Sequence, residues 1–381
     1  MKNLRLVALC SVVVCTFLFS NCGSSSPSET IGVTSGSGQS VQVGSGYAAL
    51  VVTVTKGGTG VSGVTVTFTA PSTGASCAFP GGATDTETTT SSGVATSAVC
   101  TANHKAGAYK VTAAVSGASG AASFSLTNLA GAANAIAATS GTPQSAIVST
   151  AFTNPLVATV TDQYGNGVSG ETVTFTAPSS GASGTFAGGV NTATTNSSGV
   201  ATSAVFTANS TQGSYTVTAS DTHVTGTASF SLTNNLPPVI AVQSGSGQSA
   251  TVNTAFAAQL VAYVAQNGSA LQGAVVTFTP PTTGASGTFA GGVNTATTNA
   301  QGLATSAIFT ANTKAGAYSV TASTPGATAS ASFTLTNNAG PAAAISATSG
   351  SGQSATVGTA FTNPLVATVS DQYGNPVSGV T

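Results

Sequence analysis

The chain repeats itself with a period of about 104 residues. A glutamine that closes a short Ser- and Gly-rich phrase recurs at Gln39, Gln144, Gln248 and Gln353, with spacings of 105, 104 and 105 residues. This period is too long for a solenoid repeat of about 20 to 50 residues, and it suits a complete small domain. We therefore expect an array of small domains, with three complete copies and the beginning of a fourth.

The period sets the expected division of the 381-residue chain. From the N-terminus we expect a signal peptide at 1–21, a Ser-rich tether at 22–30, complete repeats at 31–135, 136–239 and 240–344, and an incomplete fourth repeat at 345–381. The fourth copy stops where one of its strands should begin. We therefore expect the chain to be a fragment of a longer protein.

Within one copy the hydrophobic pattern has a period of two. In the second copy, Val173 and Phe175 alternate with threonines, and so do Tyr215, Val217 and Ala219. Such alternation is typical of strands buried on one face. About seven short strands in about 104 residues, separated by Gly- and Asn-rich turns, predict an all-β fold of tandem immunoglobulin-like β-sandwiches. The run 200–207 is apolar on both faces, which leaves its register open.

Composition excludes several classes of protein. Charged residues are 3% of the chain, against about 25% in an ordinary soluble domain. The 6 Lys and Arg residues cannot build the basic patch that nucleic acid requires, and a 41% hydrophobic content is too high for a disordered chain. The 2 His and 7 acidic residues leave little material for acid–base catalysis. We expect a non-enzymatic protein without a cofactor. Its surface should be made polar by hydroxyl groups rather than by charges.

A series of motifs carries a resemblance to a known family. In the second copy the run 155–166 ends in Asp-Gln-Tyr-Gly-Asn, and Val-Ser-Gly at 168–170 and Gly-Ser-Tyr-Thr-Val-Thr-Ala at 213–219 follow. These motifs resemble the bacterial Ig-like type 1 (Big-1) domain, the repeat of intimin- and invasin-type surface adhesins. The first and third copies depart from it, with Lys-Gly-Gly at 56–58 and Gln-Asn-Gly at 266–268 at the turn. The resemblance implies an extracellular stalk more than any particular receptor. The partner we expect is a host, matrix or glycan surface.

The N-terminal residues have the pattern of an export signal. A short basic start precedes an apolar run at 6–19, which is shorter than the roughly 20 residues of a membrane span. The residues before Cys22 resemble a bacterial lipobox, although Phe19 and Asn21 depart from its usual leucine and small residue. We expect acylation of Cys22 to attach the chain to a membrane, with the protein exported to the outer membrane or cell surface. Ordinary cleavage and secretion is the alternative.

Two further cysteines mark the first repeat. Cys77 and Cys100 replace a glycine and a phenylalanine of the other copies, at positions expected on adjacent strands. We predict a disulfide between them, because an exported chain meets an oxidising environment; two buried free thiols are the alternative. Closing this loop would contribute about 3 kcal/mol. We also expect the first repeat to carry alanine in place of Phe152, so that the bridge offsets a thinner core.

Candidate chemistry is sparse. His104 and His223 are expected in exposed loops, without a ligand role. Asp162 and Asp371 head equivalent turns, where an aspartate commonly caps its own backbone. Calcium needs six or more oxygen ligands, and no cluster of carboxylates supplies them, so no metal site is predicted. Serine and threonine are abundant, but no histidine and acid recur beside them to build a catalytic triad.

The function expected from these patterns is a lipid-anchored cell-surface stalk with an adhesin-like role. One alternative is a carbohydrate- or matrix-binding module, in which Tyr164 and Tyr373 would be stacking platforms. Another is the spacer region of a larger secreted enzyme or adhesin whose C-terminal part is missing. Because Ig-like folds carry many functions, the fold alone does not decide among them.

Overall fold

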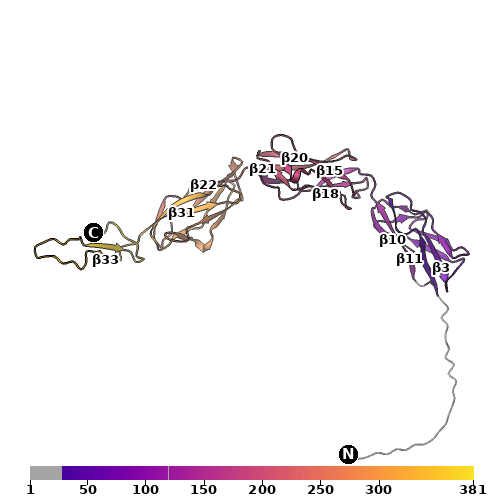
Figure 1. Cartoon of the computed structure of the whole chain (residues 1–381), viewed down its shortest axis with the longest axis horizontal. Coiled ribbons are helices and arrows are strands. Elements are labelled where there is room, and N and C mark those ends of the chain that lie inside the picture. The colour runs from indigo at the N-terminus through magenta and orange to yellow at the C-terminus, as the bar shows by residue number, and fades with distance from the viewer. Residues whose placement is uncertain (1–27, 119) are drawn as a thin grey trace, which may run out of the picture. The chain divides into compact units, whose positions relative to one another are not determined.

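The computed structural model describes residues 28–118 and 120–381 (Figure 1). In this part of the chain the regular structure consists of β-strands and two short 3₁₀ turns, which confirms the predicted all-β class of tandem Ig-like sandwiches. The predicted signal peptide (1–21), the lipidation candidate Cys22 and most of the tether lie outside the described residues.

The first repeat is a sandwich of two sheets. Its strands are β1 (Glu29–Ser35), β2 (Gln39–Gln42), β3 (Val51–Lys56), β4 (Thr59–Gly60), β5 (Thr65–Thr69), β6 (Cys77–Ala78), β7 (Thr84–Thr88), β8 (Val94–Thr96), β9 (Thr101–Ala102), β10 (Gly107–Val115) and β11 (Ala121–Leu129). One sheet has the order β1-β3-β4, with β8 also paired to β3. The other has the order β2-β11-β10-β5-β7, and β6 pairs with β9.

The second repeat has the same plan. Its elements are β12 (Ala135–Ser140), β13 (Gln144–Ile147), β14 (Val157–Thr161), β15 (Thr172–Thr176), β16 (Gly184–Phe186), the 3₁₀ turn η1 (Ala187–Gly189), β17 (Thr192–Thr194), β18 (Val200–Thr202), β19 (Phe206–Ala208), β20 (Gly213–Asp221) and β21 (Thr227–Asn235). The sheets are β12-β14-β18 and β13-β21-β20-β15-β17, and β16 pairs with β19.

The third repeat follows this plan, and the fourth begins it. The third contains β22 (Val239–Ser244), β23 (Gln248–Thr251), β24 (Val261–Gln266), β25 (Ser269–Ala270), β26 (Val275–Thr279), β27 (Gly287–Phe289), η2 (Ala290–Gly292), β28 (Thr295–Thr297), β29 (Leu303–Thr305), β30 (Phe309–Ala311), β31 (Gly316–Ser323) and β32 (Ala331–Asn338). Its five-stranded sheet is β23-β32-β31-β26-β28. The fourth contributes a pair of strands, β33 (Ala344–Ser349) and β34 (Val366–Ser370).

The hydrophobic core of each sandwich comes from the alternation seen in the sequence. In β11 every second side chain is buried, with Phe124 and Leu126 at the centre and serines on the outer face. Val66 and Phe68 of β5 pack in the same cluster. Each complete repeat holds more and shorter strands than the seven expected, because stretches such as β1 to β2 and β8 to β9 pair in one sheet and then continue in another.

The run 200–207, whose register the sequence left open, shows how a strand changes sheet. Ala201 in β18 and Phe206 in β19 are both buried, but β18 pairs with β14 whereas β19 pairs with β16. Between them the Ser203 hydroxyl accepts a hydrogen bond from the backbone of Leu156 at 3.0 Å. Val205 is 56% exposed. The run is apolar on both faces because its two halves bury opposite sides.

The recurring Gly–Gln phrase has a local structural cause. The register of β1 against β3 shifts between Val33 and Ser35, and the next residue, Gly36, has a φ of 93° that favours glycine. The Gln39 amide then donates to the carbonyls of Gly36 and Ala48 at 2.6 and 3.0 Å. The same bridge is made by Gln144, Gln248 and Gln353. The phrase therefore fixes the bulge at which the chain moves from one sheet to the other.

Cys77 and Cys100 form the predicted disulfide, with their Cα atoms 5.6 Å apart. The expected thinner core is wrong. Tyr47 is 2% exposed and takes the place assigned to Phe152 in the second repeat. Its backbone N–H donates to the carbonyl of Cys100, as that of Phe152 donates to Phe206. The first repeat thus has both the disulfide and an aromatic ring at this position.

Tyr47 also changes a buried hydrogen bond. In the third repeat the hydroxyl of Tyr318 donates to Asn337 at 3.0 Å. In the first repeat the hydroxyl of Tyr47 donates to the equivalent side-chain oxygen, that of Asn128, at 2.6 Å. The buried hydroxyl of Tyr109 is left without the bond that its counterpart makes.

Tyr109→Phe should therefore be nearly neutral, whereas Tyr318→Phe should cost about 1 kcal/mol, because it leaves the Asn337 oxygen unpaired. Hydrogen exchange measured repeat by repeat would give both values. Equal losses in the two variants would contradict this assignment.

Candidate functional site

The turn from Asp162 to Asn166, which we name the Asp turn, is held by a network of side-chain hydrogen bonds. One carboxylate oxygen of Asp162 accepts the backbone N–H groups of Tyr164 and Asn166, each at 2.9 Å. The predicted capping role is confirmed. Both Asp162 and Asn166 are buried.

The rest of the Asp turn binds residues that are distant in the sequence. The second carboxylate oxygen of Asp162 accepts the N–H of Gly131 at 2.8 Å. The Asn166 amide donates to the carbonyl of His104 at 2.9 Å and accepts the N–H of Ala106 at 2.9 Å. The segment 161–168 accordingly belongs to the same compact unit as the first repeat. These partners were not predicted, because local turn chemistry does not reveal them.

The same turn recurs at Asp371–Asn375 with equivalent partners. Asp371 accepts the N–H of Gly340 at 2.8 Å, and Asn375 bonds to the carbonyl of Thr313 and the N–H of Ala315, both at 2.9 Å. All of these residues lie in the second compact unit.

The third repeat has a different arrangement at this position. Asn267 accepts the N–H of Leu236 and donates to the side chain of Asn235, both at 2.8 Å. Gln266 donates to the carbonyl of Leu236 at 2.9 Å. These bonds are exposed, and they lack the buried carboxylate of the Asp turn.

Hydrogen bonding keeps the Asp-turn carboxylates ionised. Burial alone would raise the pKa of Asp371, but hydrogen bonds from the Asn375 side chain and the Gly340 backbone outweigh it and lower the pKa to about 2. The pKa of Asp162 is lowered by the equivalent bonds, again against the effect of burial.

On acidification, Asp371 should therefore keep its charge below the usual carboxyl range. The charged form stabilises the fold above the ordinary pKa of about 4, and this contribution disappears as the pH falls through about 2. NMR titration of the Asp371 carboxyl carbon should give a midpoint near that pH, and Asn375→Ala should raise it. A wild-type midpoint close to 4 would show that the hydrogen bonds do not favour the charged form.

The two candidate stacking residues sit in the Asp turns. The ring of Tyr164 stacks on that of His104, with centroids 4.0 Å apart and planes 5° from parallel. Tyr164 is 44% exposed, and Tyr373 is half-buried. One face of the Tyr164 platform is therefore covered by the chain's own histidine. A ligand role for either tyrosine stays a prediction.

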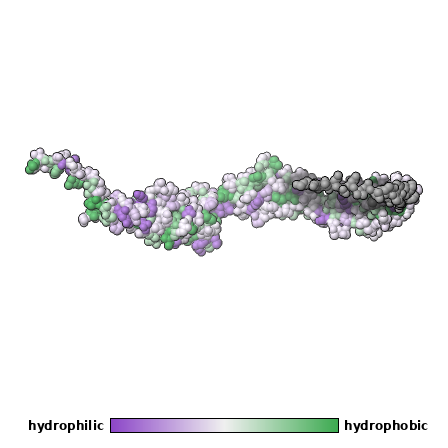
Figure 2. Space-filling model, turned by 90° about the horizontal axis from the view of Figure 1, so that it is seen from below, coloured by the Kyte–Doolittle hydropathy of each residue, from purple (hydrophilic) through white to green (hydrophobic). Residues whose placement is uncertain are grey.

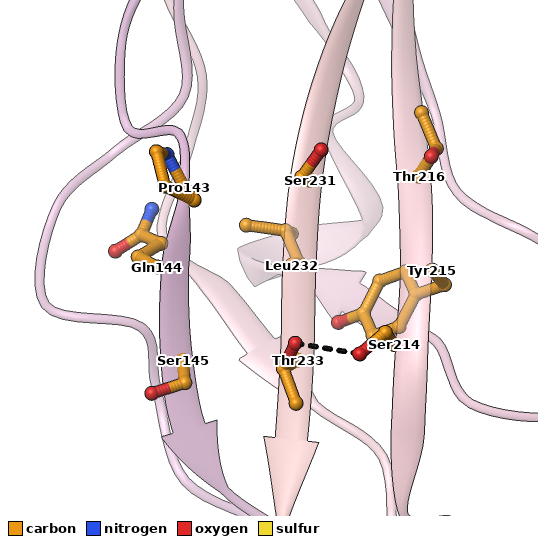
Figure 3. Close-up of a pocket in the computed structure, with 9 residues that line it drawn as sticks. All are labelled: Pro143, Gln144, Ser145, Ser214, Tyr215, Thr216, Ser231, Leu232 and Thr233. Carbon is orange, nitrogen blue, oxygen red and sulfur yellow. Dashed lines mark hydrogen bonds between the residues drawn. The ribbon is translucent and has the colours of Figure 1, made fainter.

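A shallow hollow lies on the five-stranded sheet of the second repeat (Figure 3). It has a volume of about 540 Å³ and is lined by Pro143, Gln144, Ser145, Ser214, Tyr215, Thr216, Ser231, Leu232 and Thr233. The hydroxyls of Ser214 and Thr233 bond to each other at 2.8 Å, and that of Tyr215 donates to Asn234. A smaller hollow of about 330 Å³ occupies the equivalent place in the third repeat. These hollows offer hydroxyl groups but no charge.

The surface agrees with the hydroxyl-rich composition. Figure 2 shows a mostly pale face of intermediate hydropathy, with purple and green in separate patches. No helix among the described residues has the length and apolar character that a membrane crossing requires.

Three titratable side chains of the second repeat meet at the end of β20. His223 lies in an exposed loop, as predicted, but its Nδ1 is 2.7 Å from the carboxylate of Glu171. The hydrogen bond to Glu171 raises the pKa of His223. Asp221 is the third member. In the described part of the chain, these side chains form the one group of His, Cys, Asp and Glu whose ligand atoms are close enough to share a metal ion. This group was not predicted from the sequence.

Neither a protein-family model nor a curated protein sequence matches this chain. Among solved structures it is similar to the Escherichia coli adhesin FdeC, with 15% identity and a TM-score of 0.40 over 81% of this chain and 97% of that chain. InvD of Yersinia pseudotuberculosis is 15% identical, with a TM-score of 0.38 over the same shares. The D0-D1 domain of intimin is 22% identical, with a TM-score of 0.20 over 53% of this chain and 97% of that chain. The fold assignment rests on the sheet topology of the chain itself.

Proposed function

We propose that this chain is a non-enzymatic bacterial cell-surface stalk of tandem Ig-like domains, of the intimin and invasin type, with an adhesin-like role. A lipid on Cys22 attaches it to the outer membrane, and the array holds a distal element away from the cell. The tandem array of sandwiches with one shared sheet plan carries this proposal.

Each Asp turn joins segments that are distant in the sequence within one compact unit. The first unit contains the segment 161–168 together with the first repeat. Asp162 and Asn166 hold that segment through part-buried hydrogen bonds at 2.8 to 2.9 Å.

The repeats themselves favour spacing over chemistry. The hollows on the second and third repeats carry no charged side chain, and the histidines do not recur from copy to copy. All three complete sandwiches share the strand order of their five-stranded sheet. Repeating one fold along the chain adds length without adding a new chemical group. The sequence resemblance to Big-1 repeats supports the same function.

The test is to express the full chain with a C-terminal epitope tag in a Gram-negative host. We expect labelled palmitate on the protein, recovery in the outer-membrane fraction, and antibody binding to the tag on intact cells. Cys22→Ala should abolish the label and release the chain from the membrane. A tag that antibody reaches only after the cells are broken would overturn the surface location, and an unlabelled wild type would overturn the lipid anchor.

Adhesion is tested with the same cells. Cells that display the chain should bind to host-cell or matrix-coated surfaces more than cells with an empty vector. Binding to a glycan array that Tyr164→Ala abolishes would instead favour the carbohydrate-binding alternative. A lack of binding to all surfaces would leave these repeats as a spacer and remove the adhesin-like role.

A further inference from the structure

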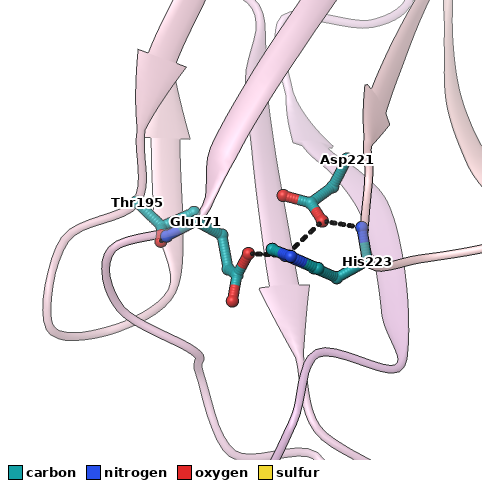
Figure 4. A network of polar contacts seen from close by, with 4 residues as sticks. All are labelled: Glu171, Thr195, Asp221 and His223. Atoms are coloured by element: carbon teal, nitrogen blue, oxygen red, sulfur yellow. Dashed lines mark hydrogen bonds and ion pairs between the residues drawn. The ribbon is translucent and has the colours of Figure 1, made fainter.

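Glu171, Asp221 and His223 converge at one end of the second sandwich (Figure 4). Glu171 precedes β15, Asp221 ends β20, and His223 follows in the next turn. The Nδ1 atom of His223 is 2.7 Å from Glu171 and 3.7 Å from Asp221. One ligand atom from each residue lies within 4.8 Å of the other two. The three side chains therefore already surround a common point.

The carboxylate of Asp221 has unused bonding capacity. Its side chain is 1% exposed, and Oδ1 accepts the backbone N–H of His223 at 2.7 Å. Oδ2 is buried without a hydrogen-bond partner. Figure 4 shows this carboxylate facing the imidazole of His223 and the carboxylate of Glu171. A buried carboxylate oxygen without a partner is costly, and a cation bound by this carboxylate would offset that cost.

The backbone under the cluster is fixed. The N–H of Glu171 donates to the Thr195 hydroxyl at 2.9 Å, and the N–H of Thr195 returns a bond to the carbonyl of Glu171 at 2.9 Å. The turn after β20 is closed by a bond from the N–H of Val224 to the carbonyl of Asp221 at 3.3 Å. In contrast, the side chain of His223 is 70% exposed, which leaves its ring room to move. A fixed backbone under the two carboxylates and an exposed imidazole suit a cation-binding site.

The other repeats show that the fold does not require these side chains. The equivalent residues are Val64, Val115 and Gly117 in the first repeat, and Ala274, Thr324 and Gly326 in the third. The turn bond of Val224 recurs in both, at 3.3 Å and 3.2 Å. All three potential ligands are thus present together in one copy and absent together from the two others.

We propose that Glu171, Asp221 and His223 form a binding site for a divalent cation of the zinc class. Each carboxylate gives one oxygen, His223 gives Nδ1, and water completes the coordination. Tetrahedral ligands about 2.1 Å from zinc are about 3.4 Å apart, so a small movement of the exposed imidazole adapts the present spacing. An imidazole nitrogen favours zinc, copper or nickel, whereas calcium prefers six to eight oxygens.

The test is calorimetric titration of ZnCl₂ into the exported chain carrying Cys22→Ala, without a histidine tag. We expect saturable binding of one equivalent. Glu171→Ala and His223→Ala should each weaken it at least tenfold, and so should Asp221→Thr, which installs the residue of the third repeat. CaCl₂ should give no saturable binding.

His104→Ala is the matched control, because it removes the other histidine of the chain and should leave zinc binding unchanged. The ring protons of His223 should shift in NMR spectra as ZnCl₂ is added. If Asp221→Thr does not fold, the exposed His223→Ala decides the outcome. The proposal is overturned by the absence of saturable binding, by binding that survives His223→Ala, or by binding that depends on His104.

Discussion

Asn234→Ala should lower the free energy of unfolding of the second repeat by about 3 kcal/mol. Asn234 is fully buried. Its amide donates to the carbonyls of Ser183 and Thr211 at 2.8 and 3.1 Å. It also donates to the side chain of Asn209 at 3.0 Å, and its oxygen accepts the hydroxyl of Tyr215 at 3.0 Å. Alanine removes every one of these bonds and leaves a gap at a fully buried position.

Hydrogen exchange followed by mass spectrometry measures this loss within the intact chain. Amides of β20 and β21 should exchange faster, while those of the third repeat stay unchanged. Asn337→Ala should produce the same loss in the third repeat. Thr216→Ala on the exposed face of β20 is the control, with an expected change below about 0.5 kcal/mol. A loss below about 1 kcal/mol in Asn234→Ala would show that the network contributes little.

The second large effect concerns the disulfide. Replacing both cysteines of the first repeat by serine should cost about 3 kcal/mol. Replacing them by the residues of the other repeats, Cys77→Gly with Cys100→Phe, should recover much of that loss without a covalent bond. The recovered part comes from burying an aromatic ring in the core.

The two substitutions must be made together. In the second repeat the ring of Phe206 lies over Gly184, where an added Cβ would be 2.7 Å from the ring. Cys100→Phe alone should therefore be less stable than the pair, because the Cβ of Cys77 occupies the space that the ring needs. Denaturant unfolding of the variants, with the reduced wild type for comparison, measures this coupling. A glycine–phenylalanine variant no more stable than the double serine variant would contradict it.

The sequence predicted the sandwich class and the disulfide because both depend on local or repeated patterns. Alternating threonine and apolar residues determine which face of a strand is buried, and Cys77 and Cys100 stand out against the other copies. The error at Tyr47 was avoidable. Tyr47 follows Gln39 at the same spacing as Phe152 follows Gln144, so counting from the glutamine places the ring correctly.

Other features depend on contacts that the sequence does not display. Asp162 was predicted to cap its turn, but its bond to Gly131 spans 31 positions. The run 200–207 divides between two sheets, which no single periodicity describes. The cluster of Glu171, Asp221 and His223 was overlooked because each residue was considered alone. Comparison of the three copies reveals that they vary together, and that signal was present in the sequence.

The pairing of β2 with β11 determines how a repeat responds to tension. β2 lies near the start of the repeat's sequence and β11 near its end, and the two strands run parallel, with Gln39 beside Leu126 and Gln42 beside Leu129. The second and third repeats pair β13 with β21 and β23 with β32 in the same way. Pulling the ends of a repeat apart loads all hydrogen bonds of the pair at once, in shear, and does not peel them one by one. We therefore expect a repeat to yield when this ladder breaks as a whole, which predicts a high rupture force along the chain.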